Sequence, residues 1–312
     1  MSQPYKIAIA GIGGVGAFYG GSLAKAYPDP SSVSVNFVAR GGHMRAIQQN
    51  GLQLQMDNGV VTSWPQAVTD NPATLGKLDL IVFCCKAYDL ERFALSFSEN
   101  IGAGTVLLPL LNGVDSTEVL QHLLPGTEVL YGCTYLFAKR IADGVIKITG
   151  DLNQLLLGSA GSDKTEVERI AGIFKATGVN VSANDDIRLK LWEKYSFISP
   201  MATATSAFNN SVGELLVDSE KKLTLQQLME EVVLLSEHKR IGLPGGIIDI
   251  NSTKLSKLPA EATSSMHNDF KAGNRTELET LTGYVVRESE QLGISVPTYT
   301  RLYALLKEKA GS

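Results

Sequence analysis

Two lysines with helical spacing, Lys190 and Lys194, are the first residues whose types and positions could do chemistry. Residues four apart share one face of a helix, and both lie in a segment with helical periodicity. A lysine that loses hydration in an apolar cleft can act as a general acid near neutral pH. The alternative is that both lysines are solvated on the surface of the helix, which is the commoner situation for this spacing.

Two further polar residues, Lys86 and Asn112, follow predicted buried strands over residues 78–84 and 105–111. Ligands of doubly wound sheets bind beyond the carboxyl ends of the strands, so either side chain could hydrogen-bond a cofactor or a substrate. The alternatives are a solvated loop lysine and an asparagine that forms a turn before a glycine.

Glu277 precedes a predicted helix over residues 278–292, in a segment rich in polar residues that begins at Ser264. A buried glutamate near a cofactor could accept hydrogen bonds from ribose or substrate hydroxyls. The alternative is an acid placed at the start of a helix, where the helix dipole favours negative charge.

The N-terminal segment predicts the scaffold that would position these side chains. A short buried strand is expected over residues 5–10, and an apolar helix is expected through residue 26. Between them lies a G-x-G-x-x-G motif, which in this strand-to-helix context indicates dinucleotide binding. In the motif the first glycine permits a tight turn, the second lets the backbone approach a pyrophosphate, and the third lets the helix pack on the strand. The residues predicted to bind the cofactor are Gly11, Ile12, Gly13, Gly14, Val15 and Gly16. The alternative is a glycine-rich structural turn.

The second predicted strand, over residues 33–38, indicates which nucleotide is bound. Sites for NAD usually carry an acid near this strand end, but here Arg40 occupies that position, with Arg45 about one helical turn later. A guanidinium pairs well with a 2′-phosphate, so the sequence favours NADPH over NADH, chiefly through Arg40. The alternative is that both arginines are surface charges.

Composition excludes several classes of function. A formal net charge of −4 and scattered basic residues argue against a nucleic-acid partner. No apolar run is long enough to span a bilayer, and the N-terminus lacks the features of a secretory leader. Three cysteines form no disulfide framework, and four widely separated histidines form no metal set. We therefore expect a cytoplasmic protein without a metal, and expect all three cysteines to be buried and inert.

The chain is expected to be an α/β protein, with an N-terminal Rossmann-type domain followed by an all-helical C-terminal domain. Strands and helices alternate up to about residue 183, and helical periodicity dominates from residue 187. We place the NADP-binding domain at 1–184 and the helical substrate and catalytic domain at 185–312, with a cleft between them. Apolar residues at helical spacing between residues 223 and 235 could form core or the interface of a homodimer.

Taken in order, these motifs resemble the ketopantoate reductase (2-dehydropantoate 2-reductase) family over most of the chain. The matching segments are Gly11–Gly16, Arg40-Gly41, Cys85-Lys86-Ala87, Asn112-Gly113, Trp192-Glu193-Lys194, Gly213-Glu214-Leu215, Ser264-Ser265-Met266 and Arg275-Thr276-Glu277. The resemblance implies NADPH-dependent reduction of 2-dehydropantoate to pantoate, in pantothenate biosynthesis. It implies that Lys194 is the proton donor.

The resemblance also implies roles for the other candidates. Asn112 would touch both cofactor and substrate, Lys86 would lie in the cofactor cleft, and Ser265 would contact the substrate. Glu277 would be the cleft glutamate that orients the cofactor ribose or the substrate. By this resemblance we expect Glu277 and Lys194 to be the catalytic residues.

The sequence departs from the family where asparagines commonly hold the substrate. The aligned positions are Ile198, Ala202 and Val212. Lost hydrogen-bonding groups in a site for a polar acid reduce discrimination strongly, so a different 2-oxo acid is an alternative substrate. Side chains that could compensate are Ser196, Ser199, Thr203 and Asn209. A non-catalytic NADP-binding sensor is the other alternative.

Overall fold

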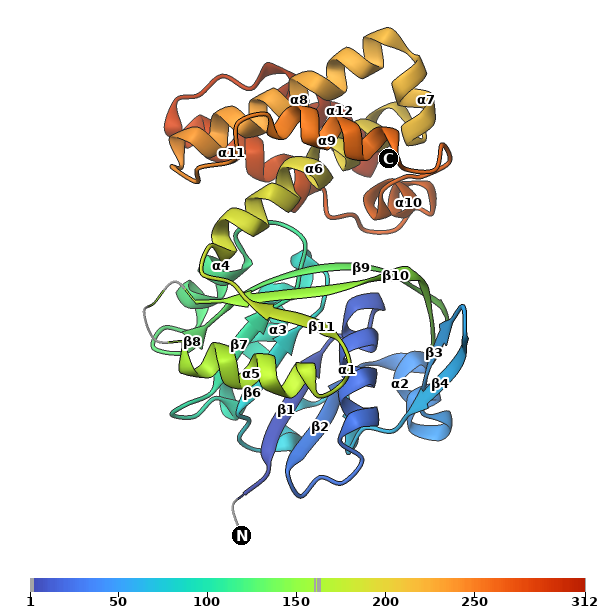
Figure 1. Ribbon diagram of the computed structural model, residues 1–312, viewed down its shortest axis with the longest axis vertical. Helices are drawn as coiled ribbons and strands as arrows, with labels where there is room; N and C mark the ends of the chain where they lie inside the picture. The colour runs from blue at the N-terminus through green and yellow to red at the C-terminus, as the bar shows by residue number, and fades with distance from the viewer. Residues whose placement is uncertain (1–2, 160, 162–163, 312) are drawn as a thin grey trace. The chain divides into compact units, whose positions relative to one another are not determined.

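The computed structural model describes residues 3–159, 161 and 164–311. The chain divides into two compact units, which are described separately (Figure 1). The first contains residues 1–111 and 115–187, and the second contains residues 112–114 and 188–312. The sequence had placed the boundary after residue 184 and had not separated residues 112–114 from the first domain.

The first unit is built on a six-stranded parallel sheet with strand order β5-β2-β1-β6-β7-β8. Its strands are β1 (Tyr5–Ala10), β2 (Val33–Val38), β5 (Ala67–Thr69), β6 (Leu80–Phe83), β7 (Val106–Pro109) and β8 (Glu128–Val129). All four residues of β6 and of β7 are buried, as expected for central parallel strands covered on both faces. The α/β prediction for this half of the chain is therefore confirmed.

Helices cover one face of this sheet, and a helix with a second sheet covers the other. On one face α3 (Leu90–Ser96) and α4 (Ser116–Leu123) pack against Ala8, Ala10 and Phe83. On the other face α1 (Gly14–Ala26) packs against both sheets, with α2 (Gly41–Asn50) beside β5. This arrangement fixes both ends of the loop that joins β1 to α1.

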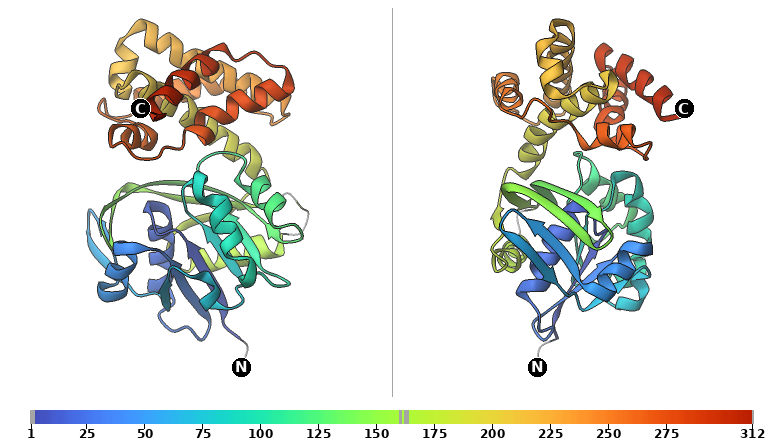
Figure 2. Two further views of the ribbon diagram at one scale, coloured as in Figure 1. Left: turned by 180° about the vertical axis from the view of Figure 1, so that it is seen from behind. Right: turned by 90° about the vertical axis from the view of Figure 1, so that its right-hand side faces the viewer.

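The second sheet was not expected from the sequence. Its strand order is β11-β10-β3-β4, with β9 paired to β10. The strands are β3 (Leu52–Met56), β4 (Gly59–Ser63), β9 (Tyr131–Ala142), β10 (Val145–Gly158) and β11 (Asn180–Ala183), and α5 (Thr165–Lys175) precedes β11. The long antiparallel pair β9–β10 lies over α1, as both figures show (Figures 1 and 2).

The second unit is helical, as the sequence predicted. Its elements are α6 (Ile187–Phe208), α7 (Val212–Val217), α8 (Ser219–His238), α9 (Ile247–Ser256), α10 (Ser265–Lys271), the π-helical turn η4 (Glu279–Gly283), α11 (Tyr284–Leu292) and α12 (Pro297–Gly311). Side chains cap several of these helices: Ser211 and Glu214 form a capping box on α7, and Asp218 caps α8. No helix within the described ranges is long and apolar enough to cross a membrane.

The apolar face of α8 belongs mainly to the core of this unit. Leu225, Leu228, Val232 and Leu235 are at most 3% exposed in the single chain, whereas Leu223 is 55% exposed. Four of the five residues that the sequence left open between core and dimer interface are therefore core residues.

Candidate active site

The glycine loop between β1 and α1 has the geometry that its motif predicts. Gly11 has a φ of +99°, a conformation that favours glycine, and its N–H donates to the Val38 carbonyl at 3.1 Å. A Cβ at Gly11 would lie 2.9 Å from the Cys85 nitrogen. The loop therefore turns tightly against the residues that follow β6.

The three other glycines of the loop differ in the space around them. A Cβ on Gly14 would lie 2.4 Å from the Ala138 oxygen, and one on Gly16 would lie 2.0 Å from the Gly11 oxygen. A Cβ on Gly13 would meet no atom within 4 Å. Gly13 is the N-cap of α1, and no side chain caps that helix. An accessible backbone at an uncapped helix N-terminus fits a pyrophosphate.

His43 supports this loop, a role that the sequence analysis did not find. The buried ring donates from Nε2 to the Ile12 carbonyl at 2.7 Å, and Nδ1 accepts from the Gly144 N–H at 2.9 Å. One neutral tautomer satisfies both bonds, and burial lowers the pKa of His43 below its ordinary value. No local motif indicates this role, because the two partners lie 31 and 101 residues away.

Arg40 lies two residues beyond the end of β2, as predicted. Its guanidinium pairs with Asp89 at 3.2 Å and lies over the Phe93 ring at 5.7 Å. Arg92 pairs with the other oxygen of the same carboxylate at 2.8 Å. Asp89 and Arg92, neither of which the sequence motifs indicated, therefore lie beside Arg40. Arg45 is exposed on α2.

Lys86 and the cysteines follow β6, which ends at Phe83, one residue earlier than the predicted strand. Lys86 is half-buried and is the N-cap residue of the short turn η2 (Ala87–Asp89). Cys84 and Cys85 thus lie beyond the strand and are only partly buried, so the expectation that all three cysteines are buried is wrong for these two; Cys133 is buried in β9. Desolvation raises the pKa of the Cys84 thiol well above its usual value, which favours the protonated thiol.

In the second unit, the structure brings Lys194 and Asn112 together. The Lys194 ammonium on α6 donates to the Asn112 side-chain oxygen at 3.1 Å, across 82 residues of sequence. Lys190, on the same helix, instead forms an ion pair with Glu193 at 2.8 Å. The two lysines that the spacing made equivalent are therefore distinguished by their partners.

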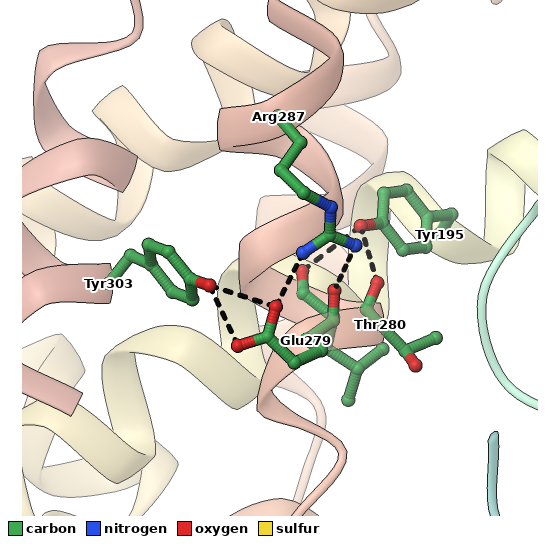
Figure 3. Close-up of polar contacts among 6 residues, drawn as sticks. Tyr195, Glu279, Thr280, Arg287 and Tyr303 are labelled. Carbon is green, nitrogen blue, oxygen red and sulfur yellow. Dashed lines mark hydrogen bonds and ion pairs between the residues drawn. The ribbon is translucent and has the colours of Figure 1, made fainter. Parts of the chain in front are cut away.

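Glu277 is 4% exposed and lies two residues before the π-helical turn η4. Tyr195, the neighbour of Lys194, donates its hydroxyl to the carbonyls of Thr280 and Leu281, each at 3.0 Å (Figure 3). These bonds satisfy carbonyls of the irregular turn and tie it to α6. The segment after Glu277 is thus fixed to the helix that carries Lys194.

The outer side of the same turn is held by ionic contacts. The Glu279 carboxylate accepts hydrogen bonds from the Tyr303 hydroxyl at 2.7 and 2.8 Å and from Arg287 at 2.5 Å (Figure 3). This side is solvent-exposed, with Glu279 at 58% and Arg287 at 45%. The turn is therefore restrained from α11 and α12 as well as from α6.

Ser265 is the first residue of α10 and is exposed, while its neighbour Ser264 caps the helix by accepting from the His267 N–H at 3.0 Å. The predicted role of Ser265 in substrate binding remains a prediction.

The side chains suggested as replacements for the missing asparagines are engaged elsewhere in the unit. Ser196 accepts from Asn251, Ser199 donates to the Leu281 carbonyl, Thr203 bonds Thr282, and Asn209 bonds His267. Ala202 and Val212 are buried, and Ile198 is half-buried. Helical spacing places Ile198 and Ala202 one and two turns after Lys194, so the face of α6 beyond the lysine is apolar.

A glycine loop of this geometry on a parallel sheet, followed by a separate helical unit, is typical of the class of pyridine-nucleotide-dependent oxidoreductases. Comparison with known families agrees. The model described as "Ketopantoate reductase PanE/ApbA" matches residues 7–162, and the model of its C-terminal part matches residues 186–310. The chain belongs to the ketopantoate reductase family and is an oxidoreductase.

Individual relatives cover nearly the whole chain. A crystal structure of 2-dehydropantoate 2-reductase from Porphyromonas gingivalis W83 is 36% identical, with a TM-score of 0.85 over 97% of this chain and 99% of that one. A 2-dehydropantoate 2-reductase of Pyrococcus abyssi is 29% identical over 97% of each chain. A D-mandelate dehydrogenase, solved with NADH and anilino(oxo)acetate, shares the fold at 22% identity with a TM-score of 0.87 over 98% of each chain.

Proposed function

We propose that this protein uses NADPH to reduce the carbonyl group of a 2-oxo acid, and that 2-dehydropantoate, which would yield pantoate, is the first substrate to test. Relatives named 2-dehydropantoate 2-reductase support this substrate. The observation that carries the proposal is the hydrogen bond between Lys194 and Asn112. This bond orients the Lys194 ammonium and so supports Lys194, instead of Lys190, as the proton donor.

The residues of the first unit fit the nucleotide. The pyrophosphate would lie against Gly13 and the uncapped N-terminus of α1, where the backbone is accessible. Arg40 would pair with the 2′-phosphate, and Lys86 would bind the cofactor beyond the end of β6. When bound, the reduced nicotinamide supplies a hydride to the carbonyl carbon of the substrate.

The residues of the second unit would control charge and proton at the carbonyl oxygen. An ammonium has three N–H donors, so Lys194 can donate to that oxygen as well as to Asn112. As negative charge develops on the oxygen, Lys194 stabilises it and transfers a proton to it. Ser265 would contact the substrate carboxylate, and Glu277 would orient a ribose or substrate hydroxyl.

Lys194→Ala tests this role, with Lys190→Ala as the matched control. Loss of a general acid is expected to lower kcat by roughly 10²- to 10⁴-fold, measured as loss of nicotinamide absorbance with NADPH and 2-dehydropantoate. Lys190→Ala removes the same charge four residues away and is expected to retain turnover near that of the parent. Equal, small effects in both variants would refute the assignment of Lys194.

The apolar face of α6 after Lys194 favours a second candidate substrate, a 2-oxo acid with an apolar side chain. Ile198 and Ala202 offer methyl groups and no hydrogen bond to a substrate hydroxyl. The shared fold with a D-mandelate dehydrogenase is compatible with such a substrate. A panel of 2-oxo acids decides: a higher kcat/KM for branched or aromatic members would select this candidate. Tight NADPH binding without turnover of any member would instead indicate a non-catalytic sensor.

A further inference from the structure

The acid that is missing from the sequence at the end of β2 is supplied by another part of the chain. Asp89 is the last residue of η2, which follows β6, yet its carboxylate contacts the arginine two residues beyond β2. One oxygen lies 3.2 Å from Arg40 and the other lies 2.8 Å from Arg92. The carboxylate is 20% exposed, whereas the arginines are 56% and 59% exposed. Contacts on both oxygens therefore orient Asp89 between two exposed cations.

The end of β2 is where proteins of this fold distinguish NADH from NADPH. A carboxylate there accepts hydrogen bonds from the ribose hydroxyls of NADH, and an arginine there pairs with the 2′-phosphate of NADPH. This chain places both groups within one ion pair. A 2′-phosphate must compete with Asp89 for Arg40 and is repelled by the carboxylate, whereas a 2′-hydroxyl can donate to it.

We propose that Asp89 determines nucleotide preference, and that its carboxylate lets the protein bind NADH as well as NADPH. This inference rests on the proposed function, because it places the adenosine ribose at the end of β2. With NADH bound, the Asp89 carboxylate accepts a hydrogen bond from the ribose 2′-hydroxyl and keeps its ion pairs with Arg40 and Arg92. With NADPH bound, Arg40 turns to the phosphate, and Arg92 keeps Asp89 paired at 2.8 Å.

The experiment measures dissociation constants of NADPH and NADH, from nicotinamide fluorescence, for the parent protein, Asp89→Ala and Glu91→Ala. Glu91 is exposed on the first turn of α3, so Glu91→Ala makes the same change in net charge without touching the ion pair. In Asp89→Ala, a lost charge-assisted hydrogen bond is expected to weaken NADH about tenfold, while NADPH binds as well as before or better. Glu91→Ala is expected to leave the ratio of the two constants unchanged.

The ratio of the two dissociation constants decides the outcome. A rise of about tenfold in the preference for NADPH, seen in Asp89→Ala and not in Glu91→Ala, supports the proposal. A smaller change, or equal weakening of both nucleotides, overturns it. Asp89→Asn, which keeps the shape of the side chain, repeats the measurement if the alanine variant fails to fold, and is expected to shift the ratio in the same direction.

Failure of this inference is distinguishable from failure of the proposed function. If the parent binds both nucleotides and Lys194→Ala loses turnover while the ratio in Asp89→Ala stays constant, only the role of Asp89 is refuted. If the parent binds neither nucleotide, the proposed function fails with it. If Arg40→Ala weakens both nucleotides equally, the assignment of the 2′-phosphate to Arg40 is wrong.

Discussion

Gly13 and Gly16 belong to the same motif, and the structure predicts opposite consequences for the same substitution at each. Around Gly13 an added methyl group meets nothing within 4 Å, and φ is −84°, which alanine adopts freely. At Gly16 the added carbon would lie 2.0 Å from the Gly11 oxygen and 2.9 Å from the Cys84 Cβ. Alanine at Gly13 therefore tests nucleotide binding, whereas alanine at Gly16 tests the packing of α1 on β1.

The expected energies follow from these contacts. Gly13→Ala leaves the fold intact and is expected to change the free energy of unfolding by less than about 1 kcal/mol, because restriction of the unfolded chain by alanine opposes the loss of glycine at an N-cap position. In Gly16→Ala, α1 must move about 1 Å to bring the 2.0 Å approach to 3.0 Å, the shortest that real Cβ atoms show. Overpacking is expected to cost about 3 kcal/mol, and the higher helix propensity of alanine offsets about 1 kcal/mol of it. The free energy of unfolding is therefore expected to fall by about 2 kcal/mol.

Two assays on both variants test this reasoning. Urea denaturation is expected to show a stable Gly13→Ala and a destabilised Gly16→Ala. Nicotinamide fluorescence is expected to show at least about tenfold weaker NADPH binding by Gly13→Ala, because its methyl group occupies the space that a pyrophosphate needs. If Gly13→Ala binds NADPH as tightly as the parent, the pyrophosphate does not lie on Gly13, and the assignment of this loop is wrong.

Two further predictions concern stability. Burial lowers the pKa of His43 and of His267, so each histidine binds its proton more readily in the unfolded chain than in the folded one. The free energy of unfolding is therefore highest above about pH 6.5 and falls as the pH decreases below that value. The decrease is at most about 1.4 kcal/mol per pH unit for each histidine. Urea midpoints between pH 7.5 and 5.5 should show this slope, and His43→Asn should reduce it; an unchanged slope would contradict the neutral tautomer. The buried Glu231 carboxylate accepts the first-turn N–H groups of α12, both at 2.8 Å, so Glu231→Ala is expected to cost about 2–4 kcal/mol by urea denaturation. The exposed neighbour Glu230 is the control, and equal losses in both variants would refute the capping role.

The sequence was sufficient to predict the fold class and the helix that follows the glycine loop. The alternation of strands and helices, the glycine motif and the change to helical periodicity near residue 187 are local patterns, and the observed β1, α1 and α6 agree with them closely. Local patterns are informative here because burial on two faces makes parallel strands continuously apolar, and because only glycine tolerates the backbone conformation at Gly11.

The second sheet escaped prediction because its pairing is not local. β10 pairs with β3 across roughly ninety residues. Two separate apolar segments of the sequence, residues 145–149 and 155–157, belong to one long β10 with an irregular register. Polar residues between those runs hid their continuity, because part of β10 is exposed and does not need apolar side chains.

The candidate residues were named from the sequence alone, but their individual environments came from tertiary structure. Spacing alone could not distinguish Lys190 from Lys194; Glu193 pairs with the first, and Asn112 accepts from the second. Likewise the sequence showed Arg40 without an acid, and chain topology then brought Asp89 to it. Composition and periodicity determine which face of an element is buried, because burial depends on each residue's own chemistry. Which two polar groups meet depends on how distant segments pack, and only the folded chain decides that.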